Sequence, residues 1–170
     1  MIIQGRVWKF TRDISATDLV AARHDKIGMG RDWAACAKLL LEDVDADFAG
    51  QVHPGDILIV AGTFGLGHAH YYNAGIQGLR HAGVSAVFAN NLNGLFFRSS
   101  TDLGLKTWRY PDIVSLVKTG DEIRLDLSLG SFENLSTGQE LEIDPVPQLI
   151  RDIFIAEGSS NWALRQVGAA

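Results

Sequence analysis

The sequence contains a single cysteine in 170 residues, Cys36. One cysteine excludes a disulfide within the chain, and it also excludes an iron–sulfur cluster or a thiolate zinc site held by this chain alone. Cys36 shares a helical stripe with Trp33, Ala37 and Leu40, as is typical of a small buried side chain. We therefore assign no chemistry to the thiol.

Long apolar runs and basic runs are also missing. No stretch approaches the roughly 18 apolar residues of a membrane helix, and residues 1–10 alternate polar and apolar side chains instead of forming a signal peptide. Acidic residues outnumber basic ones 20 to 15, for a formal charge of −5, and no Lys/Arg-rich segment is present. We therefore expect a cytoplasmic protein with neither a nucleic-acid nor a membrane partner.

The composition that remains is typical of a folded domain. Hydrophobic residues make up 46% of the chain and charged residues 21%, which excludes a disordered chain and a coiled coil. No internal repeat or linker interrupts the sequence. Its length matches one ordinary domain, so we expect a single domain over residues 1–170.

The pattern of apolar residues predicts a mixed α/β fold. Continuous apolar runs indicate buried strands over 57–61 and 84–89, joined by a glycine-rich turn over 62–67 and a helix over 70–82 that Gly83 ends. This order is a βαβ unit, whose two strands are parallel and whose crossover is right-handed. The turn lies at the carboxyl end of the first strand, where open α/β sheets bind ligands.

The flanking segments complete this prediction. Strict alternation after Gly120 indicates a small antiparallel meander, and Pro145 opens an amphipathic helix whose apolar face includes Leu149. Because Gly28 and Gly30 interrupt any regular pattern, we expect a flexible charged loop before the helix that begins at Trp33. The ranges are a strand over 2–10, the loop over 11–31, a helix over 33–42, and strands over 122–127, 132–135 and 140–143.

The glycine turn carries the residues that could form a site. Gly65 and Gly67 permit positive φ and close approach of a ligand, and the first N–H groups of the following helix favour an anion such as a carboxylate. A histidine at a helix N-terminus tends to stay neutral, so His68 and His70 could act as bases near pH 7. The alternative is that both side chains cap the helix or face water.

Other chemistries lack their usual residues. His68 and His70 are two positions apart, and no H-x-x-E-H or Cys/His spacing exists, so we expect no metal bound by this chain. The G-x-S-x-G signature of serine hydrolases is missing as well.

The order of segments resembles the small subunit of 3-isopropylmalate dehydratase, which is similar to the swivelling fourth domain of aconitase. The resemblance runs nearly end to end and implies a swivelling β/β/α domain of the aconitase small-subunit type. The matching segments are Gly5-Arg-Val-Trp-Lys-Phe10, Thr17-Asp18, Ala22-Arg23, Gly55-Asp-Ile-Leu-Ile-Val-Ala61, Phe64-Gly-Leu-Gly67, Ala82-Gly-Val-Ser-Ala-Val87, Leu95-Phe-Phe-Arg98, Leu103-Gly-Leu105, Gly120-Asp-Glu122, Asn134-Leu-Ser-Thr-Gly138, Pro145-x-Pro147 and Glu157-Gly158.

The resemblance also implies a partner and a reaction. In this family the small subunit binds no cofactor, a separate large catalytic subunit holds a [4Fe–4S] cluster, and the active site forms between the two subunits. The reaction removes a proton from the carbon next to a carboxylate and expels hydroxide from a small carboxylic acid, which makes the enzyme a hydro-lyase.

The sequence departs from the family at the catalytic turn. Where the family has Ser-Ser-Arg-Glu-His, with a serine base and a carboxylate-binding arginine, this chain has His68-Ala69-His70-Tyr71-Tyr72. A later family arginine is replaced by Gly94. Because a neutral imidazole cannot imitate the bidentate fork of a guanidinium, we expect a different substrate or a changed chemistry.

We therefore predict a divergent small subunit in which His68 replaces the serine as the base. The alternatives are a non-catalytic or regulatory homologue, and a stand-alone module that binds a small organic anion. The expected substrate-binding residues are Gly65, Gly67, Ala69, His70, Tyr71, Asn73, Asp18 and Arg23.

Overall fold

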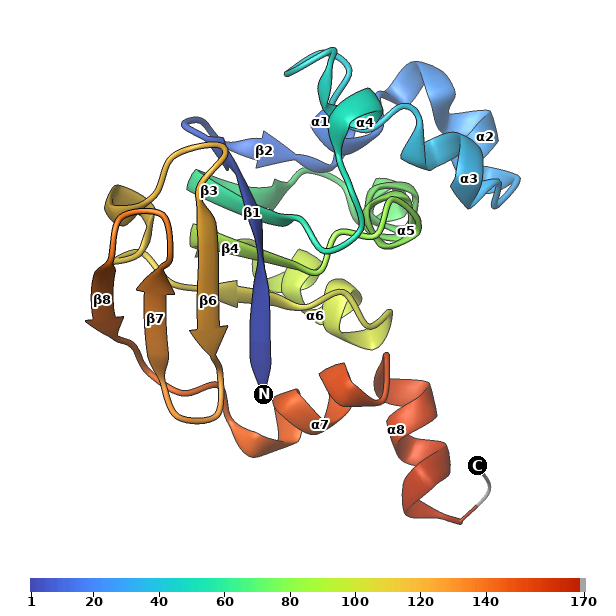
Figure 1. Ribbon diagram of the computed structural model, residues 1–170. Coiled ribbons are helices and arrows are strands. Elements are labelled where there is room, and N and C mark those ends of the chain that lie inside the picture. Colours follow the sequence, from blue (N-terminus) through green and yellow to red (C-terminus); the bar gives the residue numbers. More distant parts are fainter. Residues whose placement is uncertain (169–170) are drawn as a thin grey trace.

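The computed structural model describes residues 1–168 as one eight-stranded sheet covered by short helices (Figure 1). The strands are β1 (Ile2–Phe10), β2 (Ile14–Ser15), β3 (Ile57–Leu66), β4 (Ala86–Leu92), β5 (Thr107–Arg109), β6 (Glu122–Asp126), β7 (Ser131–Asn134) and β8 (Gln139–Glu142). The helices are α1 (Ala16–Leu19), α2 (Asp25–Met29), α3 (Trp33–Ala37), α4 (Phe48–Gln51), α5 (Tyr72–His81), α6 (Gly94–Asp102), α7 (Gln148–Ile155) and α8 (Ser159–Gln166), with 3-10 turns η1 (Ala22–His24), η2 (Ala69–Tyr71) and η3 (Val114–Leu116).

The sheet has a parallel half and an antiparallel half that meet at β1. The strand order is β5-β4-β3-β1-β6-β7-β8, with β2 beside β3. Strand β1 pairs in parallel with β3 through Val7 and Ile57, and it pairs in antiparallel with β6 through Ile3 and Leu125. The predicted parallel pair of β3 and β4 and the predicted meander are therefore confirmed.

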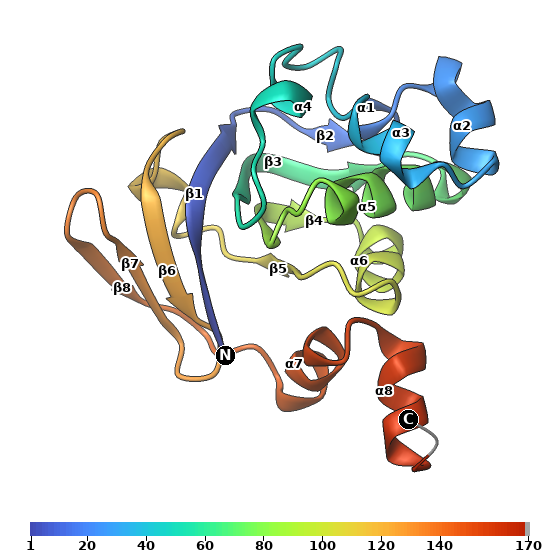
Figure 2. The same cartoon turned by 45° about the vertical axis from the view of Figure 1, so that its right-hand side comes forward.

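Three layers result from this arrangement. Figure 2 shows β6, β7 and β8 as a layer turned against β3, β4 and β5, with α3 and α5 on the other side. Along β3 the side chains alternate between two cores: Leu58 and Val60 pack with the helices, and Ile57 and Ile59 pack with the antiparallel strands. This β/β/α layering confirms the predicted architecture and explains the continuous apolar run, since both faces of β3 are buried.

The predicted flexible loop over 11–31 is wrong, because most of it forms short helices. Helix α1 begins with a reciprocal capping box between Ser15 and Asp18. Helix α2 contains Gly28, where a Cβ would lie 2.9 Å from the Cβ of Ala74 on α5. The glycine therefore lets two helices approach each other and does not interrupt the helix, contrary to the prediction.

Strand β3 continues through most of the predicted glycine turn and ends at Leu66. Its extension is paired on both sides, through Phe64 with Ile14 of β2 and through Thr63 with Asn91 of β4. Strand β4 likewise runs on to Leu92. The turn that leads into α5 is therefore shorter than predicted and begins at Gly67.

Two predicted helices also differ in extent. The helix expected over 33–42 ends at Ala37, and Leu41 beyond it adopts a left-handed φ of 58°. The helix expected after Pro145 begins at Gln148, and Leu149 is 52% exposed instead of lying on the buried face. Helix α8 was not predicted. Within residues 1–168, no helix is long and apolar enough to span a membrane.

Asp56 is a buried carboxylate that ties β1 to the loop before β3. It accepts hydrogen bonds from Arg6 Nη2 (2.7 Å), Trp8 Nε1 (2.8 Å) and the His53 backbone N–H (2.9 Å). Burial alone would raise the pKa of Asp56, but the bonds from Arg6, His53 and Trp8 outweigh it, and the pKa lies below its usual value.

We expect Asp56→Ala to lower the free energy of unfolding by about 2–3 kcal/mol at neutral pH, because it leaves the buried Trp8 N–H without an acceptor. The depressed pKa means that this stabilisation is complete above the unfolded-state value of about 4 and is lost as pH falls through the folded-state value. Urea unfolding of both proteins over a pH series measures the difference. Asp112→Ala, at an exposed position, is the control; a difference that stays constant into acid would contradict the assignment.

Candidate functional site

The candidate site lies at the carboxyl edge of the parallel strands. Strands β2, β3 and β4 end there, and α1, η2 with α5, and α6 begin directly after them. Three chain reversals therefore meet at one edge, the position at which parallel α/β sheets bind ligands. The turn after β3 carries the predicted residues His68 and His70.

Both glycines before the histidines adopt left-handed backbone conformations, as predicted, with φ of +83° at Gly65 and +106° at Gly67. Gly65 is buried, and a Cβ there would lie 2.2 Å from Cγ of Phe96. Gly67 is exposed, and a Cβ there would find its nearest neighbours, atoms of Ala16, at 4.0 Å. The lack of a side chain at Gly65 thus lets the buried side of the turn pack against Phe96, whereas the lack of one at Gly67 leaves the solvent-facing side of the turn uncovered.

Tyr72 and Asn93 hold the two neighbouring turns together. The Tyr72 hydroxyl donates to the Gly67 carbonyl (3.0 Å) and lies 3.4 Å from Asn93 Oδ1, which itself caps α6 by accepting from the Leu95 and Phe96 N–H groups. Burial raises the pKa of Tyr72. Tyr72 is therefore a scaffold residue and a poor candidate for the base. No pattern in the sequence predicts the role of Asn93.

The two histidine side chains are exposed and do not cap the helix. His68 occupies the position before η2 and Tyr71 the position before α5, and neither makes a side-chain capping hydrogen bond. The rings of His68 and His70 are nearly parallel, with centroids 5.9 Å apart, and the His70 ring lies 3.8 Å from that of Tyr71. The capping half of the alternative is therefore wrong, whereas its other half, that both side chains face water, agrees with their exposure.

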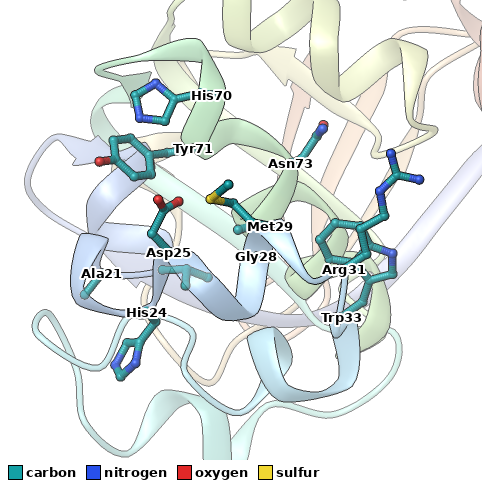
Figure 3. Close-up of a pocket in the computed structure, with 12 residues that line it drawn as sticks. Ala21, His24, Asp25, Gly28, Met29, Arg31, Trp33, His70, Tyr71 and Asn73 are labelled. Carbon is teal, nitrogen blue, oxygen red and sulfur yellow. The ribbon is translucent and has the colours of Figure 1, made fainter.

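A pocket of about 200 Å³ lies between this turn and α2 (Figure 3). It brings together three of the predicted residues, His70, Tyr71 and Asn73, but His68 and Ala69 do not line it. In Figure 3, Asp25 and Met29 point from α2 toward Tyr71, whereas the His24 ring points away. The lining residues are Val20, Ala21, His24, Asp25, Gly28, Met29, Arg31, Trp33, His70, Tyr71, Asn73 and Ala74.

Arg31 is the cation of this pocket and was not singled out from the sequence. Its backbone has a φ of 59°, its side chain is exposed, and it follows the glycine that ends α2. The only sequence signal for Arg31 is its position as a basic residue between Gly30 and Asp32, the residue that caps α3. Its membership of the pocket depends on the packing of α2 against α5, which the sequence pattern did not predict.

Asp18 and Arg23 lie outside the pocket. The Asp18 carboxylate accepts from the Ser15 backbone N–H and hydroxyl, both at 2.7 Å, within the cap of α1. The Arg23 guanidinium binds Asp43 through two hydrogen bonds of 2.7 and 2.8 Å and also contacts Glu42. Both side chains are therefore engaged by neighbouring protein groups in this structure.

The donor set of the chain does not fit an iron–sulfur cluster. Cys36 is fully buried, and burial followed by the nearby Asp32 charge raises the pKa of its thiol. Within residues 1–168, no three His, Cys, Asp or Glu side chains come close enough to hold a metal ion. Iron–sulfur clusters require several thiolates, which this chain cannot supply.

Several known proteins are similar to the chain in sequence. No family model matches it. It is 30% identical to the 3-isopropylmalate dehydratase small subunit of Thermodesulfovibrio yellowstonii, over 98% of this chain and 96% of that protein. It is 34% identical to small subunit 1 of Thermotoga maritima (95% and 94% covered) and 38% identical to the small subunit of Deinococcus deserti (96% and 88%).

A solved structure agrees with the fold. The crystal structure of 3-isopropylmalate dehydratase from Methanocaldococcus jannaschii superposes with a TM-score of 0.86 and 23% identity, covering 98% of this chain and 96% of that one. The likeness in sequence and in fold extends over almost the full length of both chains. The chain therefore belongs to the family of 3-isopropylmalate dehydratase small subunits, components of aconitase-type hydro-lyases.

Proposed function

We propose that this chain is the small subunit of a hydro-lyase that dehydrates a small hydroxy-carboxylic acid, with a substrate preference that differs from that of its relatives. The observation that carries the proposal is the exposed imidazole pair of His68 and His70 at the carboxyl edge of β3. These positions correspond to the serine and the arginine of the family turn. The whole chain acts as one domain in the cytoplasm.

His68 is the catalytic base in this proposal. Its ring is exposed and makes no capping bond, so the imidazole is accessible to take the proton from the carbon next to a substrate carboxylate. Gly67 and Ala69, on either side of His68, are exposed and leave the backbone of this turn accessible to the substrate.

The adjoining pocket binds one carboxylate of the substrate in this proposal. His70, Tyr71 and Asn73 supply hydrogen-bonding groups on one side, and Arg31 supplies a guanidinium on the other. Arg31 thereby provides carboxylate recognition that a histidine at position 70 does not. Gly65 lets this turn pack closely against Phe96. Asp18 and Arg23 hydrogen-bond to neighbouring protein groups and stabilise the segments around the site.

The partner is a large catalytic subunit that carries the [4Fe–4S] cluster. We expect the chain to co-purify with a large subunit encoded beside it, and the complex to contain iron while the isolated chain contains none in stoichiometric amount. Affinity purification followed by iron analysis measures both. Stoichiometric iron in the single chain would overturn this assignment, because one buried cysteine cannot anchor a cluster.

The same purification separates the two other functions. A chain that binds small organic anions but no large subunit would be a stand-alone binding module. A chain that forms the complex without any hydration or dehydration activity would be a regulatory homologue. The position of His68 directly after the turn glycines, where the family has its serine base, favours the catalytic function.

A further inference from the structure

A second hollow lies on the other side of the glycine turn. It has a volume of about 210 Å³ and is lined by Leu92, Gly94, Phe97, Trp108 and Arg109, at the carboxyl ends of β4 and β5. Phe97 and Trp108 meet edge to face with ring centroids 5.6 Å apart. Apart from the Arg109 guanidinium at its rim, the hollow is apolar, and we call it the Gly94 pocket.

The Gly94 pocket lies beside the turn after that of the proposed active site. The Tyr72 hydroxyl contacts both the Gly67 carbonyl (3.0 Å) and Asn93 Oδ1 (3.4 Å), so the turn that carries His68 lies beside the turn that carries Gly94. Both turns follow neighbouring parallel strands. A substrate bound at the first turn can therefore extend a substituent toward the second.

Gly94 opens this pocket by lacking a side chain. It is the first residue of α6, it does not adopt a positive φ, and a Cβ placed on it would contact nothing within 4 Å. The backbone at this position would accept other residues without strain. The glycine thus leaves empty space directly at the carboxyl edge of the sheet.

Arg109 adds a carboxylate-binding group at the rim. Its Nε donates to the Asn90 carbonyl (3.0 Å) and lies 3.4 Å from Asn91 Oδ1, which fixes the orientation of the guanidinium. Within residues 1–168, its two terminal nitrogens make no hydrogen bond to the protein. An oriented fork with free terminal N–H groups is suited to bidentate binding of a carboxylate.

We infer that the Gly94 pocket selects substrates with an aromatic substituent of about benzyl size, and that Arg109 binds a carboxylate of the same molecule. An apolar cavity of about 150 Å³ is large enough to bind benzene, so the larger Gly94 pocket has room for a phenyl ring. The paired rings of Phe97 and Trp108 offer such a ring edge-to-face contacts. This inference rests on the proposed hydro-lyase function.

The test uses the complex of this chain with its large subunit and three probes, 2-methylmalate, 2-isopropylmalate and 2-benzylmalate. We expect the wild-type kcat/KM to be at least about tenfold higher for 2-benzylmalate than for 2-methylmalate. Gly94→Val places a branched side chain at the edge of the pocket, so kcat/KM for 2-benzylmalate should fall about 10- to 100-fold while that for 2-methylmalate changes less than about twofold. Gly50→Val is the matched control, because a Cβ on Gly50 also contacts nothing within 4 Å.

A binding measurement on the isolated chain separates this inference from the proposed function. Tryptophan fluorescence should report 2-benzylmalate binding, and Gly94→Val should weaken that binding. Gly94-dependent binding without turnover of any malate would support the pocket and contradict the hydro-lyase. Turnover with equal effects of Gly94→Val on all three probes, or weakened large-subunit binding with an unchanged probe order, would overturn the pocket.

Discussion

Replacing His68 by alanine is expected to lower kcat of the reconstituted complex by about 10²–10⁴-fold, the usual contribution of a positioned general base. The side chain is exposed and makes no capping bond, so its removal should leave folding and subunit association intact. Added imidazole should restore part of the turnover of His68→Ala. Steady-state kinetics on the purified complex measures both effects.

Two further histidine variants make this result specific. His70→Ala should mainly raise KM, since His70 lines the pocket and contributes binding that is already present in the ground state. His81→Ala, at an exposed position at the end of α5, should change neither parameter. Wild-type turnover in His68→Ala would remove the proposed mechanism and leave Tyr71 or a residue of the partner as the base.

Gly65→Ala is expected to lower the free energy of unfolding by about 2–5 kcal/mol. The φ of +83° costs an alanine about 1–2 kcal/mol, and the new Cβ would lie 2.2 Å from Cγ of the fully buried Phe96, which adds about 1–3 kcal/mol of overpacking. Phe96 packs edge to face with Phe64 and Tyr72 and has no free direction in which to move. Chemical denaturation of the isolated chain measures the loss.

Gly138→Ala is the matched control for this substitution. Gly138 has a similar φ of +75°, but a Cβ there would contact nothing within 4 Å. Gly138→Ala should lower the free energy of unfolding only by the conformational cost of the positive φ, about 1–2 kcal/mol. Equal losses in the two variants would show that the contact with Phe96 contributes nothing and would contradict the packing account.

The parts of the fold that the sequence predicted are those in which one local signal is decisive. The apolar run at Ile57 required a strand buried on both faces, and the alternation at Glu122 required a half-exposed antiparallel strand. The local sequence does not reveal that Gly28 allows two helices to pack closely, because this role depends on Ala74 of another helix. A local pattern cannot distinguish a glycine that permits close packing from one that ends a helix.

The candidate site also has a part that the local sequence predicts and a part that it does not. The place of His68 and His70 at the site could be predicted because they follow the glycines within one turn. Arg31, Asn93 and Arg109 could not, since each acquires its place from contacts between segments distant in the chain. For the same reason the sequence did not reveal that Asp43 and Glu42 engage the Arg23 guanidinium.

The activity of the wild-type complex itself tests the proposed hydro-lyase function. The large subunit alone and the small subunit alone should be inactive. Their mixture should form an unsaturated acid from a 2-substituted malate, followed by the absorbance of the new double bond, and should lose this activity on His68→Ala. A stable, iron-containing complex that converts none of the malates would contradict the central claim and would identify the chain as a non-catalytic relative.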